Sequence, residues 1–362
     1  MPERRTRINI SYMKRSLFVF LVSLIFIISG CGRNYPDASG DTGSAPSNIV
    51  VGFSQLGAES DWRAANTESM KQVFTKANGY ELVFEDGQQK QSNQITAIRS
   101  FIQQGVDYIV LAPVTETGWD TVLAEAKDAG IPVIIVDRMV DVDDESLFTC
   151  WVGSDFELEG LMACEWLKKY TECQEIDAGD INVVNIQGNI GSSAQIGRTR
   201  GLRTASKRYG WNLLEEVCGD FTQAKAREVM TDFLRKYDNV NVVYCENDNE
   251  ALGAIEAIES AGLKVGSNIK EGEIMILSFD GVNEQAMQYL REGKIACITE
   301  CNPHHGPRVE SIISSLERGN MPEKLEYVDE KIYSAFDKVE FLFVKDRQHK
   351  ITILGLDNEE NY

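Results

Sequence analysis

Short apolar runs alternate with longer amphipathic segments along most of this sequence. Ile49–Phe53, Leu82–Phe84, Tyr108–Ala112 and Val133–Val136 are almost continuously apolar and rich in β-branched residues. A helical pattern over Asp61–Ala77 follows the first run, and similar stretches separate the others. Strands that are apolar on both faces are typical of parallel sheets covered by helices on both sides. The alternation therefore predicts an α/β fold.

The same plan is repeated in the second half of the chain. A second series of apolar runs covers Ile181–Ile186, Leu213–Leu214, Val240–Tyr244, Ile274–Leu277 and Ile295–Ile298. Ala-Gly-Ile at 129–131 precedes a strand that ends at Asp137, and Ala-Gly-Leu at 261–263 precedes one that ends at Asp280. Residues 49–362 also exceed the length of one ordinary domain, which is about 100–200 residues. We therefore expect two doubly wound parallel-sheet lobes.

The N-terminus carries the features of an export signal. Five basic residues within the first 15 positions precede an apolar run, Leu17–Ser29. This run is shorter than the roughly 20 residues that cross a bilayer core, so residues 1–30 are predicted to be a signal peptide. Ile28-Ser-Gly-Cys31 resembles a bacterial lipobox, which predicts lipidation at Cys31 and an extracytoplasmic, lipid-anchored or periplasmic location; an uncleaved membrane anchor is the alternative. Residues 31–48 are rich in Gly, Ser, Pro and Asp and are predicted to be a flexible tether.

Charge and cysteine content exclude several classes of protein. With 36 basic and 56 acidic residues the net charge is -20, which argues against a nucleic-acid partner. Seven cysteines besides Cys31 show no CxxC spacing, and several lie in apolar runs, so we expect mostly buried thiols. Gly188–Ser193 lacks the Lys of a P-loop, and Asp141–Glu145 lacks the Gly and distal Glu of an EF-hand loop. We expect no metal and no cofactor.

Polar residues follow several of the predicted strands. In open α/β sheets, ligands bind beyond the carboxyl ends of the strands. The residues at or just beyond these ends are Asp137, Arg138, Asn247 and Asp280, and Arg198 lies about one helical turn into the segment that follows the Ile181–Ile186 strand and its Gly-rich turn. Carboxylates and guanidinium groups pair well with adjacent hydroxyls, and Trp62 and Phe221 offer flat faces to the C–H surface of a sugar. The set indicates a neutral polyol. Helix capping by Asp137, a surface ion pair for Arg198 and core positions for the two aromatic residues are the alternatives.

Several longer stretches carry a family resemblance. They are residues 51–63, 85–91, 111–120, 130–138, 219–222, 247–248, 279–281 and 300–303. In these stretches the chain resembles the periplasmic sugar-binding proteins of ABC transporters of the ribose/galactose type, and most closely the galactofuranose-binding branch. The resemblance implies a type I periplasmic binding protein, whose two lobes are joined by a hinge of three crossovers. It places these crossovers near Gly153, Asn302 and Asp329.

The resemblance also implies lobe boundaries and site residues. The N-terminal lobe comprises residues 49–153 plus about 302–328, and the C-terminal lobe comprises 154–301 plus about 329–335. Residues 336–362 depart from the family pattern. The implied ligand-binding residues are Asp137 and Arg138 from the first lobe, Arg198, Asn247 and Asp280 from the second, Trp62 and Arg63 in place of paired aromatic rings, and more weakly Glu59, Phe221 and Glu300. The extra cysteines are a second departure from the family: Cys150 and Cys301 lie near the proposed crossovers, where a disulfide would restrain the hinge.

The function implied is that of a solute-binding lipoprotein. The expected ligand is a monosaccharide of the galactofuranose, galactose or arabinose kind, the expected partner is the membrane part of an ABC permease, and the protein is expected to be a monomer. A sugar-sensing receptor component that docks on a membrane kinase or chemoreceptor is the alternative. Related transcriptional repressors begin with a helix-turn-helix, which this chain lacks. A glycosidase would need a carboxylate pair such as Asp137 and Asp280, but a site that pairs every hydroxyl favours binding over catalysis.

Overall fold

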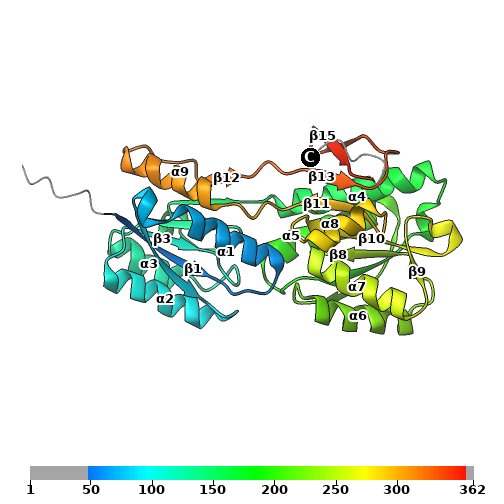
Figure 1. The fold of residues 1–362 in the computed structure, drawn as a ribbon, viewed down its shortest axis with the longest axis horizontal. Coiled ribbons are helices and arrows are strands. Elements are labelled where there is room, and N and C mark those ends of the chain that lie inside the picture. Colours follow the sequence, from blue (N-terminus) through cyan, green and yellow to red (C-terminus); the bar gives the residue numbers. More distant parts are fainter. Residues whose placement is uncertain (1–47, 356–362) are drawn as a thin grey trace, which may run out of the picture. The chain divides into compact units, whose positions relative to one another are not determined.

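The computed structural model describes residues 48–355. The predicted signal peptide over residues 1–30, the lipidation site Cys31 and the tether up to residue 47 lie outside the described residues. Within residues 48–355, no helix is long and apolar enough to cross a membrane. The described chain forms two α/β lobes, as predicted (Figure 1).

The first lobe is built on a six-stranded sheet in which every pairing is parallel. In spatial order its strands are β12 (Leu325–Tyr327), β5 (Cys150–Gly153), β4 (Val133–Val136), β3 (Tyr108–Leu111), β1 (Ile49–Gln55) and β2 (Tyr80–Asp86). Helices α1 (Asp61–Val73) and α9 (Gly306–Glu317) cover one face, and α2 (Gln91–Gln104) and α3 (Asp120–Asp128) cover the other. Two cores, one on each face, explain why the central strands are buried throughout.

The second lobe contains a larger, mixed sheet. Its strands run in the order β14 (Phe341–Val344), β15 (Arg347–Ile353), β13 (Ile332–Ser334), β11 (Ile295–Glu300), β10 (Glu273–Asp280), β8 (Val242–Cys245), β6 (Asn182–Gln187) and β7 (Asn212–Cys218), with β9 (Lys264–Val265) beside β10. The helices α4 (Phe156–Cys173) and α5 (Ser193–Tyr209) cover one face, and α6 (Gln223–Lys236), α7 (Asp248–Ser260) and α8 (Glu284–Arg291) cover the other. Four short 3-10 helices, η1 (Lys76–Asn78), η2 (Glu145–Leu147), η3 (Ala178–Asp180) and η4 (Ile269–Glu271), lie in the loops of the two lobes.

The end of the chain departs from the parallel arrangement that the sequence indicated. β13 pairs antiparallel with β11, and β14 pairs antiparallel with β15, which itself lies parallel to β13. The β14–β15 hairpin thus extends the second sheet beyond the region that resembles the family. Val339, Leu342 and Ile351 from this segment are buried in the same core as α4, so the hairpin is packed on the second lobe.

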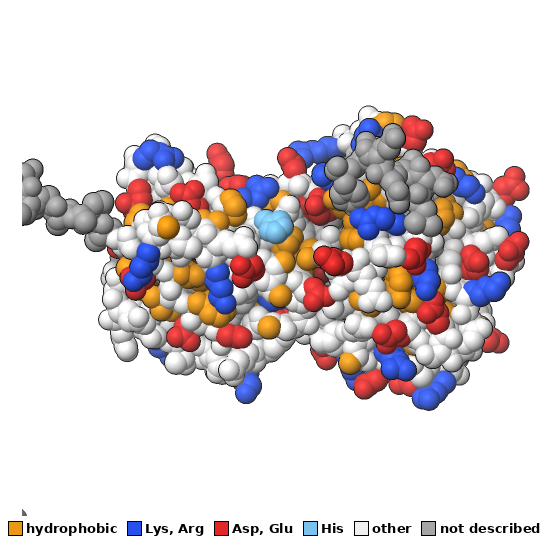
Figure 2. All heavy atoms as spheres, viewed as in Figure 1, with side chains coloured by type: hydrophobic (Ala, Val, Ile, Leu, Met, Phe, Trp, Pro, Cys, Tyr) orange, Lys and Arg blue, Asp and Glu red, His pale blue; other side chains and the backbone are white. Residues whose placement is uncertain are grey.

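The chain passes three times between the two sheets. It leaves the first sheet after β5, returns after β11 through α9 and β12, and leaves again after β12 to form β13. Both lobes therefore contain segments from distant parts of the sequence, and their relative position depends on three short connections. Figure 2 shows acidic, basic and apolar side chains interspersed over one face of both lobes.

Most cysteines in the described part of the chain are buried thiols, as expected, but the hypothesised disulfide does not form. None of the seven cysteines in the described part of the chain forms a disulfide, and five of them are buried. Cys150 lies inside β5 in the core of the first lobe. Cys301 lies at the second crossover, with its Sγ 3.3 Å from the hydroxyl of Ser154. The proposed Cys150–Cys301 bridge is therefore wrong, because each thiol is packed in its own surroundings.

Candidate ligand-binding site

A small cavity of about 20 Å³ lies where the carboxyl ends of strands from both sheets meet. This volume is well below the range of about 300–1,000 Å³ that is typical of ligand pockets, so the two lobes lie close together here. Nine of the ten residues proposed as ligand-binding line it, namely Glu59, Trp62, Arg63, Asp137, Arg138, Arg198, Phe221, Asn247 and Asp280. Ser60, Phe156, Ala194 and Cys301 also line it and were missed from the sequence.

Two aspartates occupy corresponding positions in the two lobes. Asp137 directly follows β4, and Asp280 ends β10. Both have a positive φ, 62° and 89°, a conformation that few residues other than Gly adopt without strain. Each backbone is held in this turn: the indole of Trp151 donates to the carbonyl of Asp137, and the amide of Cys301 donates to the carbonyl of Asp280.

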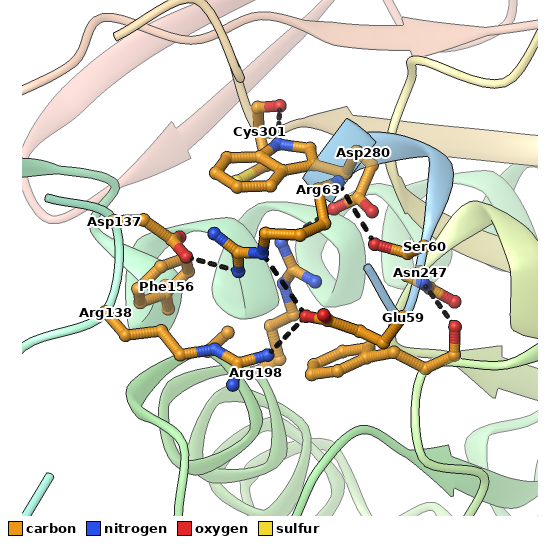
Figure 3. A pocket seen from close by; sticks show the side chains of 13 residues that line it. Glu59, Ser60, Arg63, Asp137, Arg138, Phe156, Arg198, Asn247, Asp280 and Cys301 are labelled. Atoms are coloured by element: carbon orange, nitrogen blue, oxygen red, sulfur yellow. Dashed lines mark hydrogen bonds and ion pairs between the residues drawn. The ribbon is translucent and has the colours of Figure 1, made fainter. Parts of the chain in front are cut away.

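On the first lobe, two guanidinium groups and two carboxylates form one network (Figure 3). Arg63 donates to Asp137 Oδ2 at 2.6 Å and to Glu59 Oε1 at 3.3 Å, and Arg138 donates to the same Glu59 oxygen at 3.1 Å. All four side chains are almost completely buried. Burial alone would raise the pKa of Asp137, but the charges of Arg63 and Arg138 outweigh it and hold that pKa below its usual value. Asp137 is therefore ionised at neutral pH.

On the second lobe, one guanidinium group donates hydrogen bonds to two carboxyl groups and to a backbone carbonyl. Arg198 donates from Nε to Glu159 at 2.7 Å, from Nη2 to Asp280 at 3.1 Å and from Nη1 to the carbonyl of Glu246. Burial raises the pKa of Asp280 to about 8, and the charges of Asp248 and Glu159 add to this effect although Arg198 opposes it. Asp280 therefore carries a proton for much of the time at neutral pH and is able to donate as well as accept a hydrogen bond.

Apolar side chains complete the cavity. Trp62, Phe156, Ala194, Phe221 and Cys301 form one small buried cluster. The indole of Trp62 donates to the carbonyl of Cys301 at 2.6 Å, and the guanidinium carbon of Arg63 lies 4.5 Å from the centre of its ring. One face of Trp62 is thus covered by Arg63, which is where the resemblance indicated a second aromatic ring.

Phe221 is set into the wall of the second lobe by its backbone. It has a φ of 58°, its amide donates to Glu250 at 3.0 Å, and its carbonyl accepts from Asn247 at 3.1 Å. A Cβ added to Gly188 would lie 1.9 Å from the ring of Phe221. Gly188 is therefore required by close packing against this ring. The Oδ1 atom of Asn247 accepts a hydrogen bond from the amide of Glu250 and so caps α7. Asn247 therefore also has a structural role.

Glu300 is the proposed site residue that does not line the cavity. Its carboxylate accepts from the amide of Lys331 at 2.9 Å and from the hydroxyl of Tyr333 at 3.3 Å. Glu300 therefore binds the start of β13 to the end of β11. The neighbouring residue, Cys301, is the one that reaches the cavity.

A group of buried polar side chains joins the three crossovers next to the cavity. The hydroxyl of Ser154 and the amide of Asn302 both donate to Glu330 Oε1, at 2.6 Å and 2.8 Å. Potential ligand atoms of Glu159, Cys301 and Glu330 lie within 4.8 Å of one another. Burial, and then the charge of Glu159, raises the pKa of Glu330, while burial raises that of Glu159 despite Arg198. Protonation of one of these two carboxyl groups removes their mutual repulsion.

Comparison with known proteins agrees with this architecture. Residues 51–334 match the family described as periplasmic binding protein domain. The galactofuranose-binding protein YtfQ of Escherichia coli is 42% identical over 290 residues, which are 79% of this chain and 87% of that protein. The ribose import binding protein RbsB of Bacillus subtilis is 24% identical over 84% of this chain and 97% of its own.

Solved structures show the same relationship. The periplasmic binding component of the arabinose ABC transporter of Shewanella sp. ANA-3, bound to α- and β-L-arabinofuranose, is 39% identical with a TM-score of 0.73, covering 79% of this chain and 91% of that one. A protein from Mycobacterium smegmatis in complex with β-D-fucofuranose has the same identity, TM-score and coverage. YtfQ, RbsB and the Shewanella protein are binding proteins and not enzymes. The chain belongs to the periplasmic binding protein family, in its ribose/galactofuranose type.

Proposed function

We propose that this protein is the lipid-anchored, extracytoplasmic solute-binding component of an ABC sugar importer, and that it encloses one monosaccharide between its lobes. The relatives named above bind galactofuranose, arabinofuranose and fucofuranose. We therefore propose the furanose form of a galactose- or arabinose-like sugar as the ligand. The cavity is lined by residues of both lobes, so a ligand held there would contact both.

The main support for this proposal is the charge balance of the cavity. Three guanidinium groups line it, and each is already paired with a carboxyl group of the chain. An anionic ligand would have to compete with these carboxylates, whereas a neutral polyol adds hydrogen bonds without adding charge. Nη1 of Arg63 and Nε of Arg138 are buried and have no hydrogen-bond partner within residues 48–355. A buried donor without a partner costs about 1–3 kcal/mol, so hydroxyl oxygens that accept from these two groups stabilise the complex.

Each proposed residue has a definite part in binding. Asp137, Arg63 and Arg138 contact hydroxyls from the first lobe, and Glu59 keeps the two guanidinium groups in place. Arg198, Asn247 and Asp280 do so from the second lobe. Trp62 and Phe221, together with Phe156, contact the C–H surface of the ring.

Binding and closure form one two-state equilibrium in this proposal. The open protein binds the sugar on one lobe, and closure brings Arg198, Asn247 and Asp280 to the same ligand. Because the second lobe contacts the sugar only in the closed state, the ligand shifts the population toward closure. The closed surface is the form that the permease recognises.

Thermal unfolding against a panel of sugars tests the ligand. Purified protein is heated with D-galactose, L-arabinose, D-fucose, D-ribose and D-glucose, and a ligand at a hundredfold excess over its Kd adds about 2.7 kcal/mol of stability. We expect a rise in Tm with galactose or arabinose that Asp137→Ala abolishes. Asp128→Ala, which removes an exposed carboxylate of the same lobe, should leave the shift intact. Folded protein that shows no shift with any of these sugars contradicts the proposed ligand.

The lipid anchor needs its own test. We propose that Cys31 becomes the lipidated N-terminus, because it follows the lipobox-like residues 28–30. Cells that express the full chain and are labelled with radioactive palmitate should yield a labelled protein in the membrane fraction. Cys31→Ser should abolish the label and release the protein, whereas Cys173→Ser, at an exposed cysteine, should change neither. A labelled Cys31→Ser variant would contradict the proposal.

A further inference from the structure

A carboxylate outside the cavity connects the two lobes directly. Asp61, the first residue of α1 in the first lobe, accepts through Oδ2 from the side-chain amides of Asn249, at 3.1 Å, and Asn283. Its own amide donates to Asn249 Oδ1 at 3.3 Å. Both asparagines belong to the second lobe, 188 and 222 positions further along the chain. Asp61 does not line the cavity.

Asn283 is held in place by its own lobe, independently of Asp61. Asn283 is the N-cap of α8: its Oδ1 accepts from the amide of Ala286 at 3.0 Å, and its own amide donates to Asp248 at 3.0 Å. Asn249 lies in the first turn of α7. The side-chain amide of Asn283 is therefore held with its N–H groups free for the opposite lobe, so little additional ordering is needed to form the contact.

The charge of Asp61 also suits this position. The carboxylate lies at the N-terminal ends of α7 and α8 and in the first turn of α1. The partial positive charge of a helix N-terminus stabilises a nearby anion. In Figure 1 one end of α1 reaches the boundary with the second lobe. The geometry is thus favourable for an anion at this position and unfavourable for a cation.

We propose that Asp61, together with Asn249 and Asn283, forms a latch that stabilises the closed state without touching the ligand, and so sets how long the ligand stays bound. This inference rests on the proposed function, because it concerns closure over a sugar. Contacts that exist only between closed lobes raise the closure constant for every ligand. The latch therefore tunes affinity and leaves the choice of sugar to the residues of the cavity.

Stopped-flow kinetics with the sugar that shifts Tm most, D-galactose or L-arabinose, tests the latch. Asp61→Ala should raise koff about threefold to tenfold, as expected for the loss of a few hydrogen bonds to a charged group, with kon nearly unchanged. Glu68→Ala removes an exposed carboxylate of the same helix, which accepts a hydrogen bond from Gln72 of that helix, and should not change koff. An unchanged koff in Asp61→Ala overturns the latch.

Two further variants show whether the asparagines are the partners. Asn249→Ala should raise koff as well, and Asp61→Ala combined with Asn249→Ala should add little, because both variants remove the same contact. Asn283→Ser keeps a capping residue at α8 but removes the amide donor, so it should raise koff without a loss of folding stability. Fully additive effects of Asp61→Ala and Asn249→Ala would contradict the contact.

A ligand-free measurement separates this inference from the proposed ligand. In the sugar-free protein the open and closed states are in equilibrium, and the latch increases the closed population. Small-angle scattering of the sugar-free protein should therefore give a larger radius of gyration for Asp61→Lys than for the wild type, because the cation faces helix N-termini and lowers that population. Glu68→Lys should match the wild type. If no sugar binds the wild type, the proposed ligand fails, and scattering alone decides the latch: equal radii for Asp61→Lys and the wild type overturn it.

Discussion

The two sides of the cavity use the same residue types to different effect. Asp137 and Asp280 each follow a buried strand with a positive φ, and each contacts a guanidinium group, at 2.6 Å and 3.1 Å. Yet the pKa of Asp137 is lowered, whereas that of Asp280 is raised to about 8. On the first lobe two arginines form ion pairs with two carboxylates, whereas on the second lobe Arg198 alone pairs with both Glu159 and Asp280. The number of cations per buried acid thus decides the protonation state, and the position in the fold does not.

The largest expected effect comes from removing the single cation of the second lobe. Arg198→Ala leaves Glu159 and Asp280 buried without a counter-charge, and breaking a buried pair costs about 3–5 kcal/mol. The loss should be greater at pH 8 than at pH 5, because the acids are protonated at the lower pH. Urea unfolding of the sugar-free protein at both pH values measures it. Arg200→Ala, at an exposed position of the same helix, is the control, and an equal loss at both pH values would contradict the ionisation scheme.

A matched pair of substitutions tests the comparison directly. At pH 7, Asp137→Asn removes the charge that Arg63 needs and should lower the free energy of unfolding by about 2 kcal/mol. Asp280→Asn replaces a largely neutral carboxyl by a neutral amide of the same shape and should cost less than about 1 kcal/mol. Chemical denaturation of the two variants side by side gives the difference. Equal losses would mean that both carboxyls are ionised.

Packing in the second-lobe wall gives a smaller effect. Gly188→Ala introduces a Cβ against the ring of Phe221, and overpacking of this kind costs about 1–3 kcal/mol. We expect weaker sugar binding as the ring is displaced into the cavity. Isothermal titration of the variant measures the change. Gly179→Ala, where no atom lies within 4 Å of the added Cβ, should bind normally; normal binding by Gly188→Ala would exclude Phe221 as part of the site.

The pH dependence of stability should differ between the lobes. Burial raises the pKa values of Asp280, Glu246 and Asp248 to about 8, 7 and 6, above those of the unfolded chain. The native state then holds more protons, so the free energy of unfolding falls as pH rises from about 4 to 8, by on the order of 1 kcal/mol per pH unit for each titrating group. The contribution of Asp137, whose pKa is lowered, is present above the unfolded pKa and is lost as pH falls through the folded value.

Denaturation profiles from pH 4 to 9 check this prediction. Asp280→Asn should flatten the upper part of the profile, because it removes the group with the highest of the three pKa values. Asp137→Asn should lower stability by a constant amount at neutral pH and change the slope of the profile only at the acidic end. A wild-type stability that rises between pH 5 and 8 would show that the second-lobe acids are ionised in the native state.

Strand ends were the part of the site that the sequence predicted well. Asp137, Asp280 and Asn247 follow apolar runs, and parallel strands bring such ends to one edge of a sheet. Both lobes and the family were predicted, and the comparisons confirm them. The protonation of Asp280 was not predictable, because Glu159 lies on a helix more than 100 positions earlier and becomes its neighbour only in the folded chain.

The features of the site and fold that the sequence did not predict also have specific structural causes. Phe156 begins α4 just after the first crossover, and nothing in the local pattern distinguishes it from a core residue. Cys301 reaches the cavity instead of Glu300, because the carboxylate of Glu300 turns to Lys331 on another crossover. The antiparallel pairing of β13 with β11 depends on strands of only three to six residues, whose direction a hydrophobic pattern does not encode.

The three connections between the lobes converge on one carboxylate oxygen, Glu330 Oε1. Independent bending of each connection would break the hydrogen bonds from Ser154 and Asn302, so the three segments are expected to move in concert about this point. In the proposed cycle of opening and closure, such coupling leaves the lobes few ways to rotate and reduces opening to motion along a single path. The entropy of the open state is then small, so less conformational freedom has to be given up each time the lobes close.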